Sequence, residues 1–291
     1  MSRTTAELLV DGVPRHLVLH TPDYSTAPRV PAMLILHGST EADDDSDDLN
    51  YPAVRFERHY DEAIFAPMRR AHGLAMAYLS ARRSSAGWFC WENGNGEVVG
   101  LCALPSTGGD EAFVRAALGL MDRSVAGGID ASRIYVFGMS GGASMAWKLG
   151  CHAPSVAAIN ASVHVAAVAG TLAPSLRAEP GAEEGQGAQQ GACCCAAPSV
   201  VAVHGDADGY VDVQSADATA RWFGIAHGCN AHDDGVPMAM MADDDDDADD
   251  DAAADDDVEL RVYGGCTRSR SRLHYYRVAG GGHTLPGAPL C

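Results

Sequence analysis

A serine stands among glycines near the middle of this sequence, in the run Gly138-Met139-Ser140-Gly141-Gly142. An apolar run, Ile134 to Phe137, comes directly before it, and a helix-like run, Ala143 to Leu149, follows. The pattern predicts a strand, a sharp turn and a helix, because side chains at the glycine positions would collide in so tight a turn. Such a turn lifts a hydroxyl clear of the sheet, so Ser140 is the candidate nucleophile.

The serine pattern needs partners before it predicts chemistry. The chain has 32 glycines, so the pattern arises easily by chance, and a glycine turn with an exposed serine is the alternative. A serine hydroxyl needs a base to take its proton, and the base needs an acid to orient it. Among twelve histidines, His283 is favoured because it follows the last apolar run in a glycine-rich loop. His274 lies inside that run and His204 ends an earlier one, so both are expected to be structural.

Three aspartates compete for the role of the acid. Asp208 lies in the loop after the apolar run 199–203, at the usual place of such an acid, while Asp206 and Asp212 are alternatives. The order Ser140, Asp208, His283 is similar to the order found in α/β-hydrolases.

Negative charge on a reacting carbonyl oxygen would need two N–H donors. The N–H of Gly141, directly after the serine, is one candidate. The loop after the apolar run 33–36 offers the other, from Ser39 or Gly38.

Elements that would position these residues alternate along the chain. Strands are expected at 33–36, 74–79, 134–137, 163–168, 199–203 and 273–278, and helices at 55–71, 110–126, 143–149 and 215–227. Alternation predicts a mostly parallel sheet with helices on both faces and chemistry at the carboxyl ends of its strands. Residues 6–20 are expected to form an antiparallel hairpin at a sheet edge. Asp110 is expected to be the N-cap of the helix at 110–126. The Trp88–Trp91 segment is expected in a glycine-rich loop.

The 291 residues are expected to form one domain, 1–291, with low-complexity surface inserts at 41–50, 175–198 and 231–257. The formal net charge is −19, yet sixteen aspartates fall in 43–48 and 243–257, and the rest of the chain has 23 acidic and 20 basic side chains. The acidic runs are expected to be solvated, disordered loops. Nucleic acid is not an expected partner, because no basic patch is present to contact phosphates.

Neither a membrane span nor a secretory signal peptide is expected, because no apolar run is long enough and the first residues lack an apolar core. The nine cysteines fit either free thiols or disulfides with one left over. A metal is not expected, since His227, Cys229 and His232, and the run 193–195, lack paired-ligand spacing. No cofactor is expected, and the oligomeric state is left open.

Taken together, the motifs resemble the polyhydroxybutyrate depolymerase and feruloyl esterase branch of the α/β-hydrolases. The matching segments are Leu36-His37-Gly38, Trp91 with Asn93, 110–113, 128–142, 168–172, His204-Gly205 with Asp208, Gly228-Cys229, Gly265-Cys266, 280–284 and Pro286-Gly287. The resemblance implies an α/β-hydrolase fold, a catalytic Ser140, Asp208 and His283, and a secreted, extracellular enzyme. It also implies a disulfide between Cys229 and Cys266.

Three positions depart from this family. Asp206 stands where a small hydroxyl residue is usual, Leu285 replaces a tryptophan, and an aspartate insert separates Cys229 from Cys266. Leu285 would lie in the wall of the substrate site. Trp88 and Trp91 are the candidates for substrate contact, although packing onto the core is the alternative for both.

The expected activity is therefore that of a serine-dependent carboxylic-ester hydrolase that works through an acyl-enzyme. Its substrate would be a small-molecule or polymeric ester, with the polyhydroxyalkanoate, feruloyl or acetyl-xylan type left open. A non-catalytic binding protein of the same fold and a serine peptidase are the alternatives.

Overall fold

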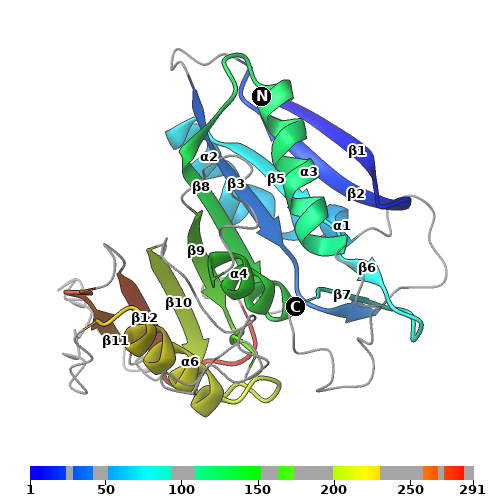
Figure 1. Ribbon diagram of the computed structural model, residues 1–291. Helices are drawn as coiled ribbons and strands as arrows, with labels where there is room; N and C mark the ends of the chain where they lie inside the picture. Colours follow the sequence, from blue (N-terminus) through cyan, green and yellow to red (C-terminus); the bar gives the residue numbers. More distant parts are fainter. Residues whose placement is uncertain are drawn as a thin grey trace, which may run out of the picture.

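The computed structural model describes residues 1–23, 29–41, 52–92, 109–151, 163–173, 199–229, 258–267 and 272–284. Within these ranges, one sheet has the strand order β1-β2-β5-β3-β8-β9-β10-β12-β11 (Figure 1). Its strands are β1 Ser2–Val10, β2 Val13–Thr21, β3 Val30–Leu36, β5 Ala75–Leu79, β8 Ile129–Met139, β9 Val163–Val168, β10 Val200–Gly205, β11 Val258–Tyr263 and β12 Leu273–Val278. A small second sheet joins β4 Thr40–Glu41, β7 Trp88–Cys90 and β6 Arg82–Arg83. Apart from Glu41, the three expected inserts lie outside the described residues.

The centre of the large sheet is parallel, as the alternation of elements predicted. Strand β3 pairs in parallel with β5 and β8, and the parallel pairing continues through β9 and β10 to β12. The β1–β2 hairpin and β11 are antiparallel additions at the two edges. The loops after β3, β8, β10 and β12 therefore share one edge of the sheet.

Helices cover both faces of this sheet (Figure 1). Helices α3 Gly109–Ser124, α4 Gly141–Cys151 and α6 Val213–Ala226 pack on one face, and α1 Pro52–Tyr60 and α2 Ala66–His72 lie on the other. All seven side chains of β3 are buried, as expected of a strand between two helical layers. In the described part of the chain, no helix is long and apolar enough to span a membrane.

The helix predicted at 55–71 is interrupted. A π-helical turn, η1 Asp61–Phe65, separates α1 from α2, and Pro67 follows it in the first turn of α2. Proline has no N–H to donate and its ring crowds the carbonyl four residues earlier, so a continuous α-helix through Pro67 is disfavoured. Gly73 ends α2 in a left-handed conformation with φ of 61°.

Four strands were not predicted, and two of them are the short strands β4 and β6 of the second sheet. Trp88–Cys90 forms β7 where a loop was expected, and Val258–Tyr263 forms β11 directly after the acidic insert. The alternation of Val258, Leu260 and Val262 with Glu259 and Arg261 is a strand signal that could have revealed β11. Strand β8 also begins earlier than the apolar run 134–137 indicated.

A buried ion pair fastens β2 to the start of α3. Arg15 Nη2 lies 2.6 Å from Asp110 Oδ1, and the two side chains are 2% and 0% exposed. The other oxygen, Asp110 Oδ2, accepts the Glu92 N–H at 2.6 Å, and the guanidinium lies 4.2 Å from the centre of the Phe113 ring. Helix α3 begins at Gly109, so Asp110 serves this ion pair inside the first turn and not as the predicted cap.

We expect Asp110→Ala to lower the free energy of unfolding by about 3–5 kcal/mol, because it leaves a buried guanidinium without its counter-charge. Denaturant unfolding followed by circular dichroism measures the loss. The double variant Arg15→Met/Asp110→Ala removes both charges and should recover most of the stability. If Asp110→Ala and wild type unfold at the same denaturant concentration, the ion pair has no such role.

Candidate active site

Ser140 occupies the turn between β8 and α4, as the glycine pattern predicted. Its φ is 52°, in the left-handed region that residues other than glycine rarely adopt. The Ser140 N–H donates to the Val168 carbonyl at 2.9 Å, and its own carbonyl accepts the Ser144 N–H at 3.1 Å. Backbone strain of this kind costs about 1–3 kcal/mol and is concentrated at functional sites in proteins.

Two glycines permit this turn because the backbone around it is in close contact. A Cβ on Gly138 would lie 2.2 Å from the Gly142 carbonyl oxygen. A Cβ on Gly142 would lie 2.3 Å from the Leu36 carbonyl oxygen and 2.4 Å from that of His37. The loop that follows β3 is therefore pressed directly against the serine turn.

His37 sets the direction of a peptide group in that loop. Its Nε2 accepts the Ala81 N–H at 2.9 Å, so the proton must be on Nδ1, which donates to the Gly38 carbonyl at 2.5 Å. The Ser39 N–H belongs to the same planar trans peptide and points the opposite way. Burial lowers the pKa of His37 to about 4, so the ring stays neutral near pH 7.

The two expected N–H donors come from neighbouring backbone. A Cβ on Gly141 would lie 3.4 Å from the Ser39 nitrogen and 2.5 Å from Ser39 Oγ, and a Cβ on Gly38 would lie 3.2 Å from Ser140 Cβ. Gly38 and Ser39 therefore lie against the Ser140–Gly141 backbone.

Trp91 lies beneath this loop and not on its surface. Its side chain is 1% exposed, and its Nε1–H donates to the His37 carbonyl at 2.8 Å. The expectation that Trp91 contacts substrate is therefore wrong. The structure has the alternative, in which Trp91 packs in the core. Trp88 is half-buried in β7, and Leu285 lies outside the described residues.

His283 and Asp208 are in direct contact. His283 Nδ1 lies 2.7 Å from Asp208 Oδ2. Asp208 Oδ1 accepts the Tyr210 N–H at 2.8 Å and the Val211 N–H at 2.9 Å. Burial raises the pKa of Asp208, but the hydrogen bonds from Val211, His283 and Tyr210 outweigh it, and the net pKa lies below its ordinary value. An ionised Asp208 holds the proton on Nδ1 and leaves Nε2 of His283 as the basic nitrogen.

His204 supports the acid loop from inside the protein. Its Nε2 lies 2.8 Å from the Val211 carbonyl oxygen and 3.6 Å from Asp208 Oδ2. The ring is buried. This position agrees with the structural role expected of His204.

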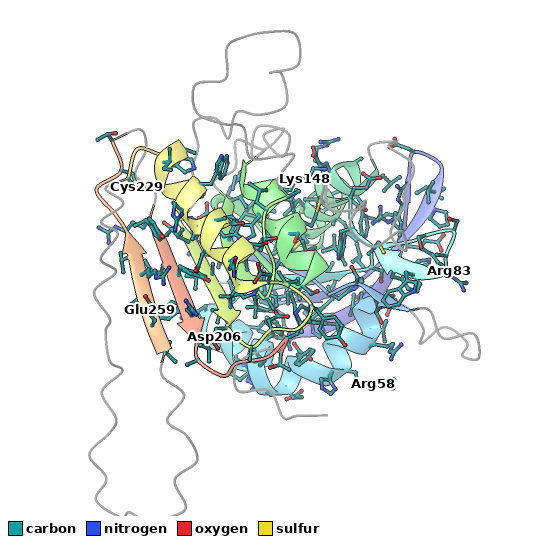
Figure 2. The ribbon with its side chains drawn as sticks, turned by 90° about the horizontal axis from the view of Figure 1, so that it is seen from below. Arg58, Arg83, Lys148, Asp206, Cys229 and Glu259 are labelled. Carbon is teal, nitrogen blue, oxygen red and sulfur yellow. A yellow bond between two sulfur atoms is a disulfide. The ribbon has the colours of Figure 1, made fainter. Side chains whose placement is uncertain are left out.

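The other two candidate acids do not contact His283. Asp206 accepts the Gly280 N–H at 2.8 Å and lies 3.4 Å from Arg277 Nη2 (Figure 2). Asp212 is the residue before α6 and makes no side-chain cap there. Asp206 thus ties the acid loop to the loop that carries His283, which gives a structural reason for a carboxylate at a position where the similar family has a hydroxyl.

The order of strands sets the order of the groups along the sheet edge. Ser39 follows β3, Ser140 follows β8, Asp208 follows β10 and His283 follows β12. Since neighbouring strands are about 4.8 Å apart, all four lie within one short stretch of the edge. The donor loop is on one side of Ser140, and the His283–Asp208 pair is on the other.

The sulfur atoms of Cys229 and Cys266 are bonded, at 2.11 Å, and join the end of α6 to the residues after β11 (Figure 2). Cys90 is disulfide-bonded as well. Among the residues that the structure describes, no three His, Cys, Asp or Glu side chains form a group that could hold a metal.

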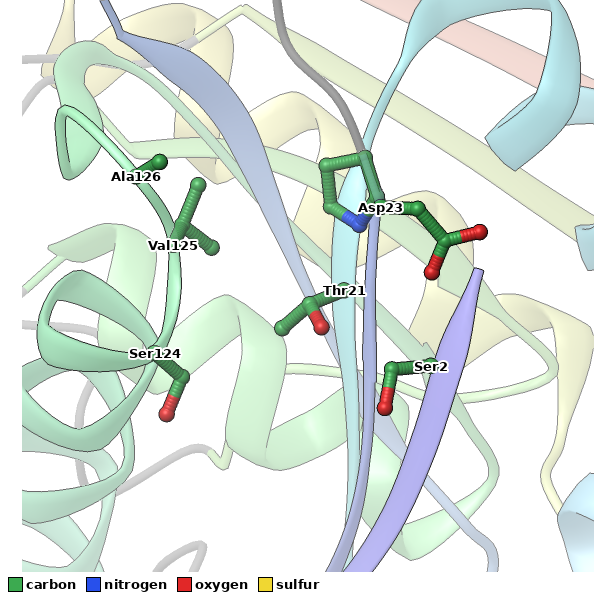
Figure 3. Close-up of a pocket in the computed structure, with 7 residues that line it drawn as sticks. Ser2, Thr21, Asp23, Ser124, Val125 and Ala126 are labelled. Carbon is green, nitrogen blue, oxygen red and sulfur yellow. The ribbon is translucent and has the colours of Figure 1, made fainter.

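A cleft lies at the opposite edge of the sheet, where β8 begins (Figure 3). It is lined by Ser2, Thr21, Pro22, Asp23, Ser124, Val125 and Ala126. None of the predicted site residues is among them, so this cleft is separate from the candidate active site.

Comparison with known proteins gives similarity of structure only. No protein-family model and no curated protein sequence matches the chain. A solved structure of acetyl xylan esterase from Aspergillus awamori is similar, with a TM-score of 0.63 and 15% identity over 97% of this chain and 95% of that one. A solved structure of a candidate dipeptidyl aminopeptidase IV from Bacteroides ovatus is similar, with a TM-score of 0.53 and 15% identity. The match covers 99% of this chain but 33% of that longer chain. The chain has the α/β-hydrolase fold, which confirms the predicted fold class.

We expect Gly142→Ala to destabilise the protein by about 1–3 kcal/mol, because its methyl group would overlap the Leu36 carbonyl oxygen and push the two loops apart. Gly264→Ala is the matched control, since a Cβ there has nothing within 4 Å. Thermal unfolding of both variants measures the difference. Equal melting temperatures for Gly142→Ala and the control would show that the contact between the loops is not tight.

Proposed function

We propose that this protein is a serine-dependent carboxylic-ester hydrolase with Ser140 as nucleophile, His283 as general base and Asp208 as the acid that orients it. The observation that supports this most is the left-handed Ser140 at the sheet edge that also carries the hydrogen-bonded His283–Asp208 pair. Asp11 and Ala169 also have positive φ, so the backbone conformation supports the proposal through its coincidence with the His283–Asp208 pair at the same sheet edge.

In the proposed reaction, Ser140 Oγ attacks the ester carbonyl carbon while His283 Nε2 takes the hydroxyl proton. The carbonyl π electrons move to oxygen, and the tetrahedral intermediate then collapses. The bond to the alcohol oxygen breaks, and that oxygen receives the proton from His283. Water repeats the sequence on the acyl-enzyme, giving up its proton to His283, and releases the acid and the free serine.

The negative oxygen of the intermediate would lie between the N–H groups of Gly141 and Ser39, with Gly38 as the alternative to Ser39. Each such donor typically stabilises the transition state by about 3 kcal/mol. In this proposal His37 acts as a positioning residue, because it holds the peptide that carries the Ser39 N–H. Trp91 supports the same loop through the His37 carbonyl.

The substrate class is an ester of small molecules or of a polymer. The similarity to acetyl xylan esterase covers nearly the whole of both chains and supports an acylated carbohydrate among the candidates. The family resemblance carried by the sequence motifs adds polyhydroxyalkanoates and feruloyl esters. The disulfides at Cys90 and at Cys229–Cys266 are compatible with the extracellular location of that family.

We expect Ser140→Ala to lose more than about a thousandfold in kcat on p-nitrophenyl acetate and methyl ferulate. The alanine side chain differs from serine only by the missing hydroxyl group, so the variant removes the nucleophile with little change in size. Hydrolysis is measured by absorbance and by chromatography, and a p-nitroanilide peptide tests the peptidase alternative. A folded wild type that is as inactive as the variant on every substrate would reject catalysis and leave the binding-protein alternative.

We expect Asp208→Asn to lower kcat by up to about 10⁴-fold, because the amide would no longer hold the required tautomer of His283. Asp206→Asn is the matched comparison, two residues away and bonded to Gly280, and its effect on kcat should be at least a hundredfold smaller. The kcat values of both variants on p-nitrophenyl acetate decide the assignment. Larger loss in Asp206→Asn would assign the acid role to Asp206.

A further inference from the structure

Tyr210 is an exposed aromatic side chain beside the candidate base. At 86% exposure, it is more open than any other large hydrophobic side chain in the described ranges. Its ring centre lies 5.1 Å from that of His283, with 48° between the planes. A solvent-exposed aromatic ring thus lies next to the His283 imidazole, which would move the proton in the proposed reaction.

The backbone that carries this ring is held firmly. The Tyr210 and Val211 N–H groups both donate to Asp208 Oδ1, and the Val211 carbonyl contacts His204 Nε2. The place at which the Tyr210 side chain leaves the backbone is therefore linked to Asp208.

The order of loops indicates which part of an ester would meet this ring. The carbonyl oxygen would point to the donors at Ser39, on the β3 side of Ser140. The alcohol oxygen has to receive a proton from His283, so it would lie on the opposite side. Tyr210 contacts His283 and hence lies beside the alcohol portion of the ester.

We propose that Tyr210 is a specificity-determining residue whose ring stacks on the alcohol portion of the ester and favours ring-bearing alcohols, aromatic or sugar-like. This proposal rests on the proposed function. A flat, open aromatic face gains more contact from another ring than from a short flexible chain. The acyl portion, on the other side of the reacting carbon, is not selected by Tyr210.

Two pairs of esters test this assignment. Benzyl acetate and propyl acetate share their acyl group, and therefore their acyl-enzyme, but differ in the alcohol. Methyl phenylacetate and methyl butyrate share their alcohol and differ in the acyl group. The values of kcat/KM are measured for wild type, Tyr210→Ala, Tyr210→Leu and Tyr210→Phe, with circular dichroism and thermal unfolding as controls for folding.

We expect the benzyl-to-propyl ratio of kcat/KM to fall roughly two- to tenfold in Tyr210→Ala and Tyr210→Leu. Tyr210→Phe keeps the ring and should keep the ratio. The ratio for the two methyl esters should stay the same in all variants. Because Tyr210→Ala and Tyr210→Leu both remove the ring, the test still holds if one of the two variants fails to fold.

Four results would overturn the proposal. An equal loss on all four esters, with a shifted pH profile, would mean that Tyr210 only holds His283 in place. A change confined to the two methyl esters would place the ring on the acyl side. Wild-type protein without Ser140-dependent turnover would reject the proposed function and this inference with it, whereas active variants with unchanged ratios would reject the inference alone.

Discussion

The conformation of Ser140 depends on a place where backbone packs against backbone with no side chain between. Gly138 allows the turn to close on Gly142, and Gly142 allows it to meet the carbonyl groups at the end of β3. The same contact brings the candidate donor loop beside the serine, so the shape of the turn and the position of the loop have one cause. Larger residues at either glycine would separate the two features that the proposed chemistry needs together.

Two histidines at this edge show how environment divides one residue type between structure and chemistry. His37 is buried, with both ring nitrogens used by backbone groups, and its low pKa keeps it neutral. His283 is partly exposed, and its Nδ1 faces an ionised carboxylate. A ring whose nitrogens are both occupied is suited to hold a peptide in place, whereas a ring with a free basic nitrogen is suited to move a proton.

The local pattern predicted the bounds of β9 and β12, whereas it missed β4, β6, β7 and β11. The π-helical turn before Pro67 was missed because periodicity alone does not show where a helix widens. Chain order indicated that Asp208 and His283 would share an edge, and the structure adds their contact. For Trp91 the sequence left substrate contact and packing onto the core as alternatives, and it did not indicate the hydrogen bond to His37, 54 positions away, that comes with the burial.

The loops after β10 and β12 touch through bare backbone, since a Cβ on Gly205 would lie 2.0 Å from the Gly281 carbonyl oxygen. The Ala207 N–H donates to that same oxygen at 3.0 Å, and Asp206 accepts a hydrogen bond from the Gly280 N–H. The two loops are therefore joined by direct backbone contact and by these two hydrogen bonds. A side chain added at Gly205 would therefore move His283 away from Asp208 through the backbone alone.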